Sequence, residues 1–163
     1  MAAKNESDES ASSGEEPGSG VYLDSSALAK LYVPEPESDS LDAFLRERRD
    51  LMISELSITE VISAVARRRR EGVLDSEKAN EIRNTLLSDA KSFLRLDLSP
   101  AVHREAETLL LSAEKIPLRT LDALHIALAR LIGASRIVTF DVRMAEAARL
   151  HGLGVVQLDS QPS

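Results

Sequence analysis

Short apolar runs alternate with amphipathic stretches along most of this chain. Apolar runs bounded by turn residues are typical of buried strands, and apolar residues spaced three and four apart are typical of helices. The pattern predicts strands over 21–24, 51–54, 93–96, 136–140 and 155–158. It predicts helices over 26–32, 37–49, 58–71, 76–91, 100–115, 120–132 and 142–151.

Turn and capping residues punctuate these elements. Glycine favours the position just after a helix, where it stands at Gly72, Gly133 and Gly152. Expected N-caps are Ser25 or Ser26, Ser76, Ser99 and Thr120. Strands separated by helices form parallel sheets covered on both faces. The fold class is therefore predicted to be α/β, a three-layer sandwich around a central, mainly parallel sheet of about five strands.

Composition narrows the setting of this fold. Residues 1–19 are mostly Ser, Gly, Glu and Asp without apolar periodicity, so we expect a disordered acidic leader before one domain over 20–160. The chain has no cysteine, which excludes disulfides and thiolate metal sites and fits a reducing, cytoplasmic location. No apolar run approaches the roughly 20 residues of a membrane span.

Charge and aromatic content limit how the chain can bind nucleic acid. The net charge of −7 argues against binding through the whole surface, although it allows a local basic groove. Only 3% of the residues are aromatic, which argues against a platform for stacking bases. The sequence also contains no Gly-rich phosphate loop.

Two predicted strands run directly into an aspartate, at Asp24 and at Asp141. Ligands of an open α/β sheet bind outside the carboxyl ends of its strands, so these carboxylates are expected at one edge. The alternative for each residue is a structural N-cap of the following helix. Two strands that end in this way favour a shared cation site over two unrelated caps.

Asp122 and Glu60 are the acids most able to join them. Asp122 lies in a helix that is apolar almost all round, and a buried carboxylate must be neutralised, paired or metal-bound. Glu60 points nearly opposite the apolar face of its own helix, which favours a solvated side chain. It becomes a candidate because that helix follows the second strand.

Further side chains are candidates for substrate contact. Arg67 returns to almost the azimuth of Glu60, about 10 Å along the helix axis, and Arg68 lies about 100° further round. One or both can meet a substrate phosphate. Ser25 and Thr139 are further candidates for substrate contact, since a hydroxyl of Ser25 or Ser26 can reach a metal-bound water and that of Thr139 can lie near the carboxylates. His125, three residues after Asp122, has metal-ligand spacing but is interpreted as a hydrogen-bonded core residue. His103 and His151 are expected at the surface or at helix ends.

Four segments together resemble the PIN-domain nucleases, and within them the VapC-type toxins of bacterial and archaeal toxin–antitoxin pairs. They are VYLDSSALAKLY (21–32), SELSITEVISAVARR (54–68), LRTLDALHIALA (118–129) and IVTFDVRMAEAARLHGLGV (137–155). The resemblance covers nearly everything from Val21 to Leu158, and its motifs are specific in combination. The acidic leader is not part of the usual family pattern.

The resemblance implies a PIN-like α/β/α sandwich and an endoribonuclease that depends on Mg²⁺ or Mn²⁺. The metal ligands would be Asp24, Glu60, Asp122 and Asp141, and the ion would activate a water to cleave RNA. Hard oxygen ligands without thiolates suit these ions better than Zn²⁺. The resemblance also implies a homodimer, inhibited by an antitoxin whose C-terminal segment lies across the active site.

Two other classes of function remain open at this point. A phosphoacceptor receiver domain has the same alternation of strands and helices, but it needs adjacent acids after the first strand, where this chain has Ser25 and Ser26 after Asp24. The second is a PIN-fold binding module that acts mainly through antitoxin complex formation and operon regulation. Four intact acids count against that as the only role.

Overall fold

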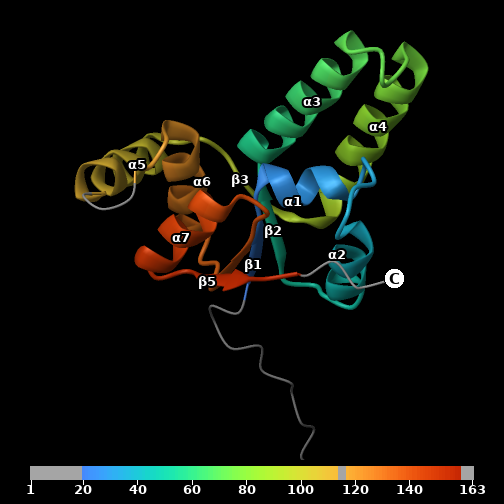
Figure 1. The fold of residues 1–163 in the computed structure, drawn as a ribbon. Helices are drawn as coiled ribbons and strands as arrows, with labels where there is room; N and C mark the ends of the chain where they lie inside the picture. The colour runs from blue at the N-terminus through green and yellow to red at the C-terminus, as the bar shows by residue number, and fades with distance from the viewer. Residues whose placement is uncertain (1–19, 114–116, 159–163) are drawn as a thin grey trace, which may run out of the picture.

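A five-stranded sheet forms the centre of the molecule (Figure 1). The computed structural model describes residues 20–113 and 117–158; the leader expected over 1–19 lies outside them. The strands are β1 (Val21–Leu23), β2 (Leu51–Ser54), β3 (Leu94–Leu96), β4 (Arg136–Val138) and β5 (Gly154–Val156). All neighbours are parallel, in the order β3-β2-β1-β4-β5. The predicted parallel sheet is confirmed, with β1 at its centre.

Helices cover both faces of this sheet. They are α1 (Ser25–Lys30), α2 (Ser38–Leu45), α3 (Glu55–Arg70), α4 (Ser76–Asp89), α5 (Pro100–Ser112), α6 (Thr120–Leu131) and α7 (Val142–Leu150), with a 3₁₀ turn at Ala90–Ser92. Alternate residues of a strand face opposite sides. Tyr22 accordingly packs with α5, α6 and α7, while Val21 and Leu23 pack with α1 to α4. This confirms the three-layer sandwich.

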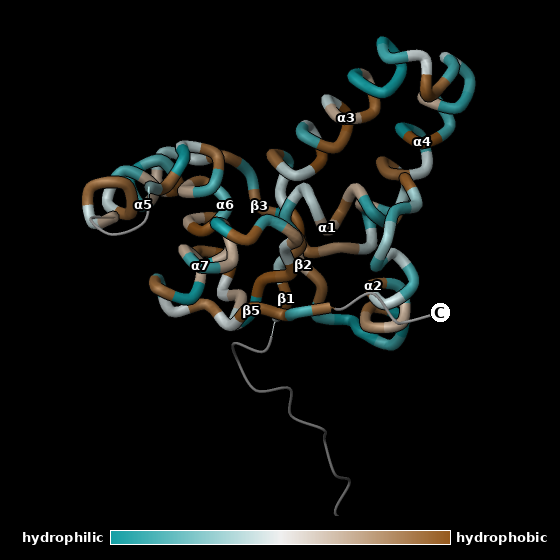
Figure 2. The backbone as a smooth tube through the Cα atoms, in the orientation of Figure 1, coloured by the Kyte–Doolittle hydropathy of each residue, from teal (hydrophilic) through white to brown (hydrophobic). Residues whose placement is uncertain are grey.

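Helices α3 and α4 pack against each other and extend beyond the sheet (Figure 1). Their outer turns are hydrophilic and the central strands hydrophobic (Figure 2). Gly72 ends α3 with a φ of 75°, a left-handed conformation that glycine adopts without strain. None of the helices within the described residues is long and apolar enough to cross a membrane.

The predicted boundaries need correction where side chains cap the backbone. Helix α3 begins at Glu55 rather than at 58, because the Ser54 hydroxyl accepts a hydrogen bond from the amide of Ser57. Asp75, not Ser76, caps α4 by accepting from the Lys78 amide. Helix α6 begins at Thr120, but Thr120 is its first residue and not its cap.

Strand β4 ends at Val138, two residues earlier than predicted. The amide of Phe140 donates to the Ser26 hydroxyl, and the amide of Asp141 donates to the Thr139 hydroxyl, so neither amide joins the strand ladder. Helix α2 also ends earlier, at Leu45 rather than 49. These differences move no candidate acid out of its predicted edge of the sheet.

Candidate functional site: an acidic pocket at the carboxyl edge of the sheet

One cavity of about 350 Å³ is lined by all four candidate acids. Asp24 follows β1, Asp141 follows β4, Asp122 lies in the first turn of α6, and Glu60 lies in the second turn of α3. We call this cavity the acidic pocket. Its position outside the carboxyl ends of neighbouring parallel strands is where α/β sheets bind ligands.

Asp24 is the most buried of the four acids, with 3% of its surface exposed. Its Oδ1 accepts hydrogen bonds from the Ser26 hydroxyl at 2.7 Å and from the Ala27 amide at 2.9 Å. Burial raises the pKa of Asp24, and the charge of His125 and a hydrogen bond from Thr139 offset part of that rise. Asp24 is therefore both the N-cap of α1 and part of the pocket. Ser25 and Ser26 are not the cap, contrary to expectation.

Asp141 combines the same two positions. Its Oδ1 caps α7 by accepting from the amides of Arg143 at 2.8 Å and Met144 at 3.1 Å. The capping alternative and the pocket location are thus compatible for both strand-end aspartates. A cap uses one carboxylate oxygen, which leaves the second available for other contacts.

Asp122 is half-buried at the start of α6. Burial raises its pKa, the Arg119 amide lowers it, and the charge of Asp141 raises it further. The expectation that α6 is buried on every side was wrong, because Leu121 and Leu131 are 47% and 48% exposed. Asp122 belongs to the pocket-facing end of a helix that is only partly covered.

Glu60 is not the solvated residue that its helix alone predicted. Its side chain is only 25% exposed, and its Oε2 lies 2.5 Å from the Nε2 of His125. Burial pushes the pKa of Glu60 up, but the hydrogen bond and charge of His125, with a hydrogen bond from Ser25, outweigh it and leave the pKa below its usual value. The ionised carboxylate is therefore the favoured form.

His125 links Glu60 to a buried hydroxyl cluster. Its Nδ1 lies 2.8 Å from the Tyr22 hydroxyl, which lies 2.7 Å from the Ser54 hydroxyl. Burial raises the pKa of Tyr22, so its hydroxyl stays protonated. A carboxylate only accepts, so Nε2 donates to Glu60, while Nδ1 shares the second hydrogen bond with the Tyr22 hydroxyl. Both ring nitrogens are occupied, which supports the core interpretation of His125 over a metal-ligand role.

Tyr22, Ser54 and Ser57 belong to this network, although their sequence pattern did not predict it. The sequence pattern predicted only that Tyr22 lies in a strand. No local pattern links Tyr22 to a histidine 103 positions away. A hydroxyl on a fully buried strand is the available signal, because a buried hydroxyl needs a partner. His103 is exposed and His151 caps the end of α7, both outside the acidic pocket, as expected.

The donor set of the pocket suits a hard divalent cation. It offers carboxylate oxygens, and no ion pair of the described residues involves Asp24, Asp122 or Asp141. Carboxylates without an ion-pair partner that lie close together gain from a bound cation. Within residues 20–113 and 117–158, however, no three His, Asp or Glu side chains stand ready to hold one ion together. The residue types fit a metal, while Glu60 is held by His125.

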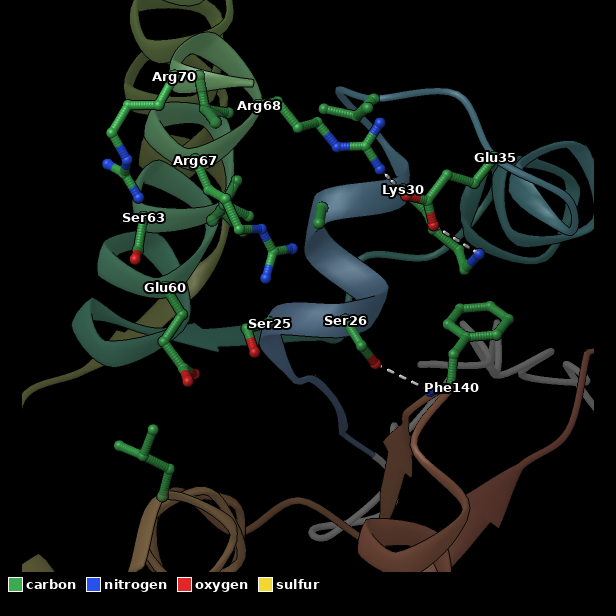
Figure 3. A pocket seen from close by; sticks show the side chains of 16 residues that line it. Ser25, Ser26, Lys30, Glu35, Glu60, Ser63, Arg67, Arg68, Arg70 and Phe140 are labelled. Atoms are coloured by element: carbon green, nitrogen blue, oxygen red, sulfur yellow. Dashed lines mark hydrogen bonds and ion pairs between the residues drawn. The ribbon is translucent and has the colours of Figure 1, made fainter. Parts of the chain in front are cut away.

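A larger cavity of about 660 Å³ adjoins the acidic pocket between α1 and α3 (Figure 3). The two cavities share Ser25, Ser26, Glu60 and Leu121. The larger cavity is lined by the basic side chains of Lys30, Arg67, Arg68 and Arg70, so we call it the basic groove. Of the expected substrate contacts, Ser25 lines both cavities and the two arginines line the groove. Thr139 lines neither cavity; it is buried, and its side chain forms a hydrogen bond with Asp24.

The parallel α/β/α sandwich with carboxylates gathered at one edge defines the structural class. The PIN domain family matches residues 21–150. Ribonuclease VapC46 of Mycobacterium tuberculosis is 36% identical over 140 residues, covering 83% of this chain and 95% of the relative. The chain therefore belongs to the PIN-domain family, as a VapC-type member.

Solved structures share this fold at lower identity. The crystal structure of M. tuberculosis VapC20, named a Sarcin-Ricin loop cleaving toxin, has a TM-score of 0.64 at 17% identity, covering 78% of this chain and 95% of that one. A toxin–antitoxin complex from Klebsiella pneumoniae has a TM-score of 0.61 at 17% identity, covering 85% and 97%. At these identities the likeness concerns the fold.

Proposed function

We propose that this protein is a Mg²⁺- or Mn²⁺-dependent endoribonuclease and the toxin of a type II toxin–antitoxin pair. The observation that carries the proposal is the single pocket lined by Asp24, Glu60, Asp122 and Asp141. The relatives named ribonuclease support the reaction class, and the acids support metal-assisted hydrolysis of a phosphodiester.

The four acids would hold the metal, with Asp24, Asp122 and Asp141 presenting carboxylates that have no ion-pair partner in the described chain. The bound ion would activate water and stabilise the leaving oxygen. The protein's own part is positional. Ser26, Thr139 and the Ala27 amide fix Asp24. His125 and Ser25 fix Glu60.

A metal-free route through histidine is poorly supported by this geometry. That route requires an imidazole free to deprotonate the 2′-hydroxyl of RNA, and both nitrogens of His125 are already hydrogen-bonded. We therefore expect products with 5′-phosphate and 3′-hydroxyl ends. Cyclic phosphate ends formed in excess EDTA would contradict the metal mechanism.

The decisive test joins cleavage to metal binding. Single-stranded RNA should be cut with Mg²⁺ or Mn²⁺ and left intact in EDTA, and Asp24→Asn or Asp122→Asn should abolish cutting. Asp97→Asn is a matched control, because Asp97 is exposed and outside both cavities. Mn²⁺ should raise the melting temperature of the wild type and the control but not of Asp122→Asn. A wild-type melting temperature unmoved by millimolar Mn²⁺ would refute the metal site.

An antitoxin partner is the second part of the proposal. The toxin–antitoxin complex with this fold supports it. Asp24, Asp122 and Asp141 have no ion-pair partner among the described residues, and such carboxylates suit an arginine side chain from a partner. Co-expression with the neighbouring small gene should yield a complex with suppressed RNase activity. If the free and the complexed protein had equal RNase activity, the partner would not be an inhibitor. Binding of that complex to its promoter would then favour the binding-module alternative.

A homodimer is a further expectation. Analytical ultracentrifugation of the purified protein tests it.

A further inference from the structure

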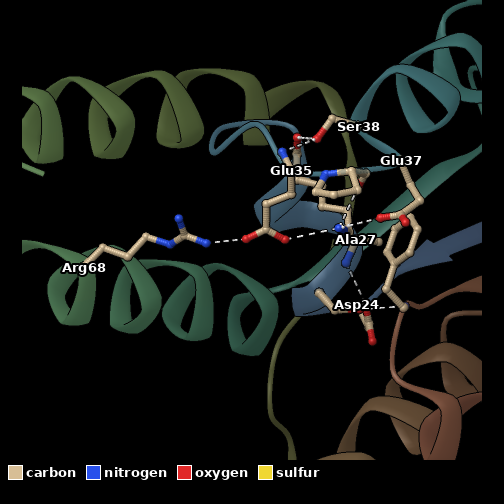
Figure 4. Close-up of polar contacts among 10 residues, drawn as sticks. Asp24, Ala27, Glu35, Glu37, Ser38 and Arg68 are labelled. Atoms are coloured by element: carbon tan, nitrogen blue, oxygen red, sulfur yellow. Dashed lines mark hydrogen bonds and ion pairs between the residues drawn. The ribbon is translucent and has the colours of Figure 1, made fainter. Parts of the chain in front are cut away.

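The four arginines that end α3 face different surroundings (Figure 3). Arg68 forms an ion pair with Glu35 in the loop between α1 and α2. Glu35 also pairs with the Lys30 ammonium at 3.1 Å, and Glu37 pairs with the same ammonium at 3.0 Å (Figure 4). The charge of Arg68 is thus balanced inside the protein, and its side chain ties α3 to this loop.

Arg67 has no such partner. No hydrogen bond or ion pair of its side chain occurs among the described residues, although Glu35 and Glu60 line the same groove. Its side chain points into the groove between α3 and α1, on the side where Ser25 and Glu60 lie (Figure 3). Seven residues separate it from Glu60, which corresponds to about 10 Å along the helix. Arg67 therefore adds a positive charge without an ion-pair partner among the described residues to the wall of the groove that adjoins the acidic pocket.

The groove offers charge but little for recognising a base. Its one aromatic lining residue is Phe140, and the Lys30 ammonium covers that ring at 4.6 Å from the centroid. Stacking of an RNA base on the ring face that Lys30 covers would require Lys30 to leave both of its glutamates. A phosphate needs only a cation with hydrogen-bond donors, and a guanidinium binds it in a fork geometry.

We propose that Arg67 binds a backbone phosphate of the RNA that flanks the phosphate being cleaved, while Arg68 holds the groove wall through Glu35. This inference rests on the proposed function. It assigns the basic groove as the path of the RNA strand on one side of the acidic pocket. Because phosphate contacts position a nucleic acid without reading its sequence, Arg67 contributes equally for different RNA sequences.

The test measures binding rather than cleavage. Labelled single-stranded RNAs of several sequences are titrated against the protein in an Asp122→Asn background, which keeps the RNA intact, over a series of salt concentrations. Arg67→Gln should weaken binding by the same factor for every sequence. It should also reduce the slope of log K against log salt by about 0.7–1, the value for one lost phosphate contact.

Two neighbouring arginines serve as controls. Arg69 lines neither cavity, so Arg69→Gln should leave the slope unchanged. Arg68→Gln should lower the melting temperature with little change in slope, because its charge is already paired. A further set of RNAs carries one neutral methylphosphonate linkage, placed at a different position in each. At one position the affinity difference between the protein with Arg67 and Arg67→Gln should disappear, because the phosphate that Arg67 binds has lost its charge.

Equal slopes for Arg67→Gln and Arg69→Gln would overturn the assignment, as would an Arg67 effect that differs between sequences. A slope loss in Arg68→Gln as large as in Arg67→Gln would overturn the division of roles. These results are separable from failure of the proposed function, which would appear as absence of metal-dependent cleavage in the unmodified protein. If Arg67→Gln left RNA binding unchanged but weakened antitoxin binding, the groove would be a peptide-binding site and the RNA assignment would be wrong.

Discussion

Tyr22→Phe removes one hydroxyl from the centre of the protein and leaves the ring in place. The Tyr22 side chain is fully buried, and its hydroxyl contacts Ser54 at 2.7 Å and His125 Nδ1 at 2.8 Å. Phenylalanine fills the same space, so no sizeable cavity forms. The change therefore isolates the hydrogen bonds that support His125, and through it Glu60.

The expected cost follows from which groups lose their partners. Ser54 keeps the Ser57 amide and hydroxyl, both at 3.0 Å. His125 Nδ1 loses its one hydrogen bond in the described structure. One buried donor or acceptor left unsatisfied costs about 1–3 kcal/mol. For a domain of this size that is a fall in melting temperature of roughly 3–10 °C.

Thermal and denaturant unfolding of the metal-free protein measure this cost. Tyr32→Phe is the matched control, because its hydroxyl makes an exposed 3.3 Å contact with Asp89, and it should change the free energy of unfolding by less than about 0.5 kcal/mol. A double-mutant cycle with His125→Leu should show coupling, since loss of both partners leaves no unsatisfied ring nitrogen. Mn²⁺ titration then reports on Glu60. Loss of a residue that orients a metal ligand costs roughly 10–100-fold in metal affinity, so Tyr22→Phe should weaken Mn²⁺ binding.

Two results would refute this reasoning. If Tyr22→Phe unfolded within about 0.5 kcal/mol of the wild type, the hydroxyl would not be supporting His125. If the costs of Tyr22→Phe and His125→Leu simply added, the two residues would not act as one unit. If Tyr22→Phe bound Mn²⁺ as tightly as the wild type, the predicted loss of stability would stand. The Tyr22 hydroxyl would then not affect metal binding through His125 and Glu60.

Other predictions follow from single features of the structure. Burial raises the pKa of Asp24 in the folded state, so ionisation of Asp24 lowers stability above that pKa. Metal-free Asp24→Asn should therefore have a higher melting temperature than the wild type at pH 7. The difference in melting temperature should close as the pH falls through that pKa. Gly72→Ala should lower the free energy of unfolding by about 1–2 kcal/mol, because φ is 75° and nothing crowds the new methyl group. Glu35→Gln breaks exposed pairs with Arg68 and Lys30 and should cost at most about 1 kcal/mol, less at high salt, as chemical denaturation would show.

Local sequence patterns were sufficient for the strands, the order of helices and the edge that carries the aspartates. Asp24 and Asp141 end apolar runs, and a parallel sheet brings the carboxyl ends of its strands to one side. Because that geometry is built into any parallel sheet, it needs no knowledge of packing. The family motifs were equally local, since each spans only a few turns of chain.

The setting of Glu60 was decided only by tertiary structure. Periodicity describes a residue relative to its own helix, and by that measure Glu60 faced solvent. Helix α6 carries His125 against the same region from 65 positions away, and the hydrogen bond between them leaves the Glu60 side chain only 25% exposed. The arginines give the same lesson: neighbours in sequence, Arg67 and Arg68 differ because a loop brings Glu35 to only one of them. Burial and charge pairing depend on which distant segments meet, and local pattern carries no information about that.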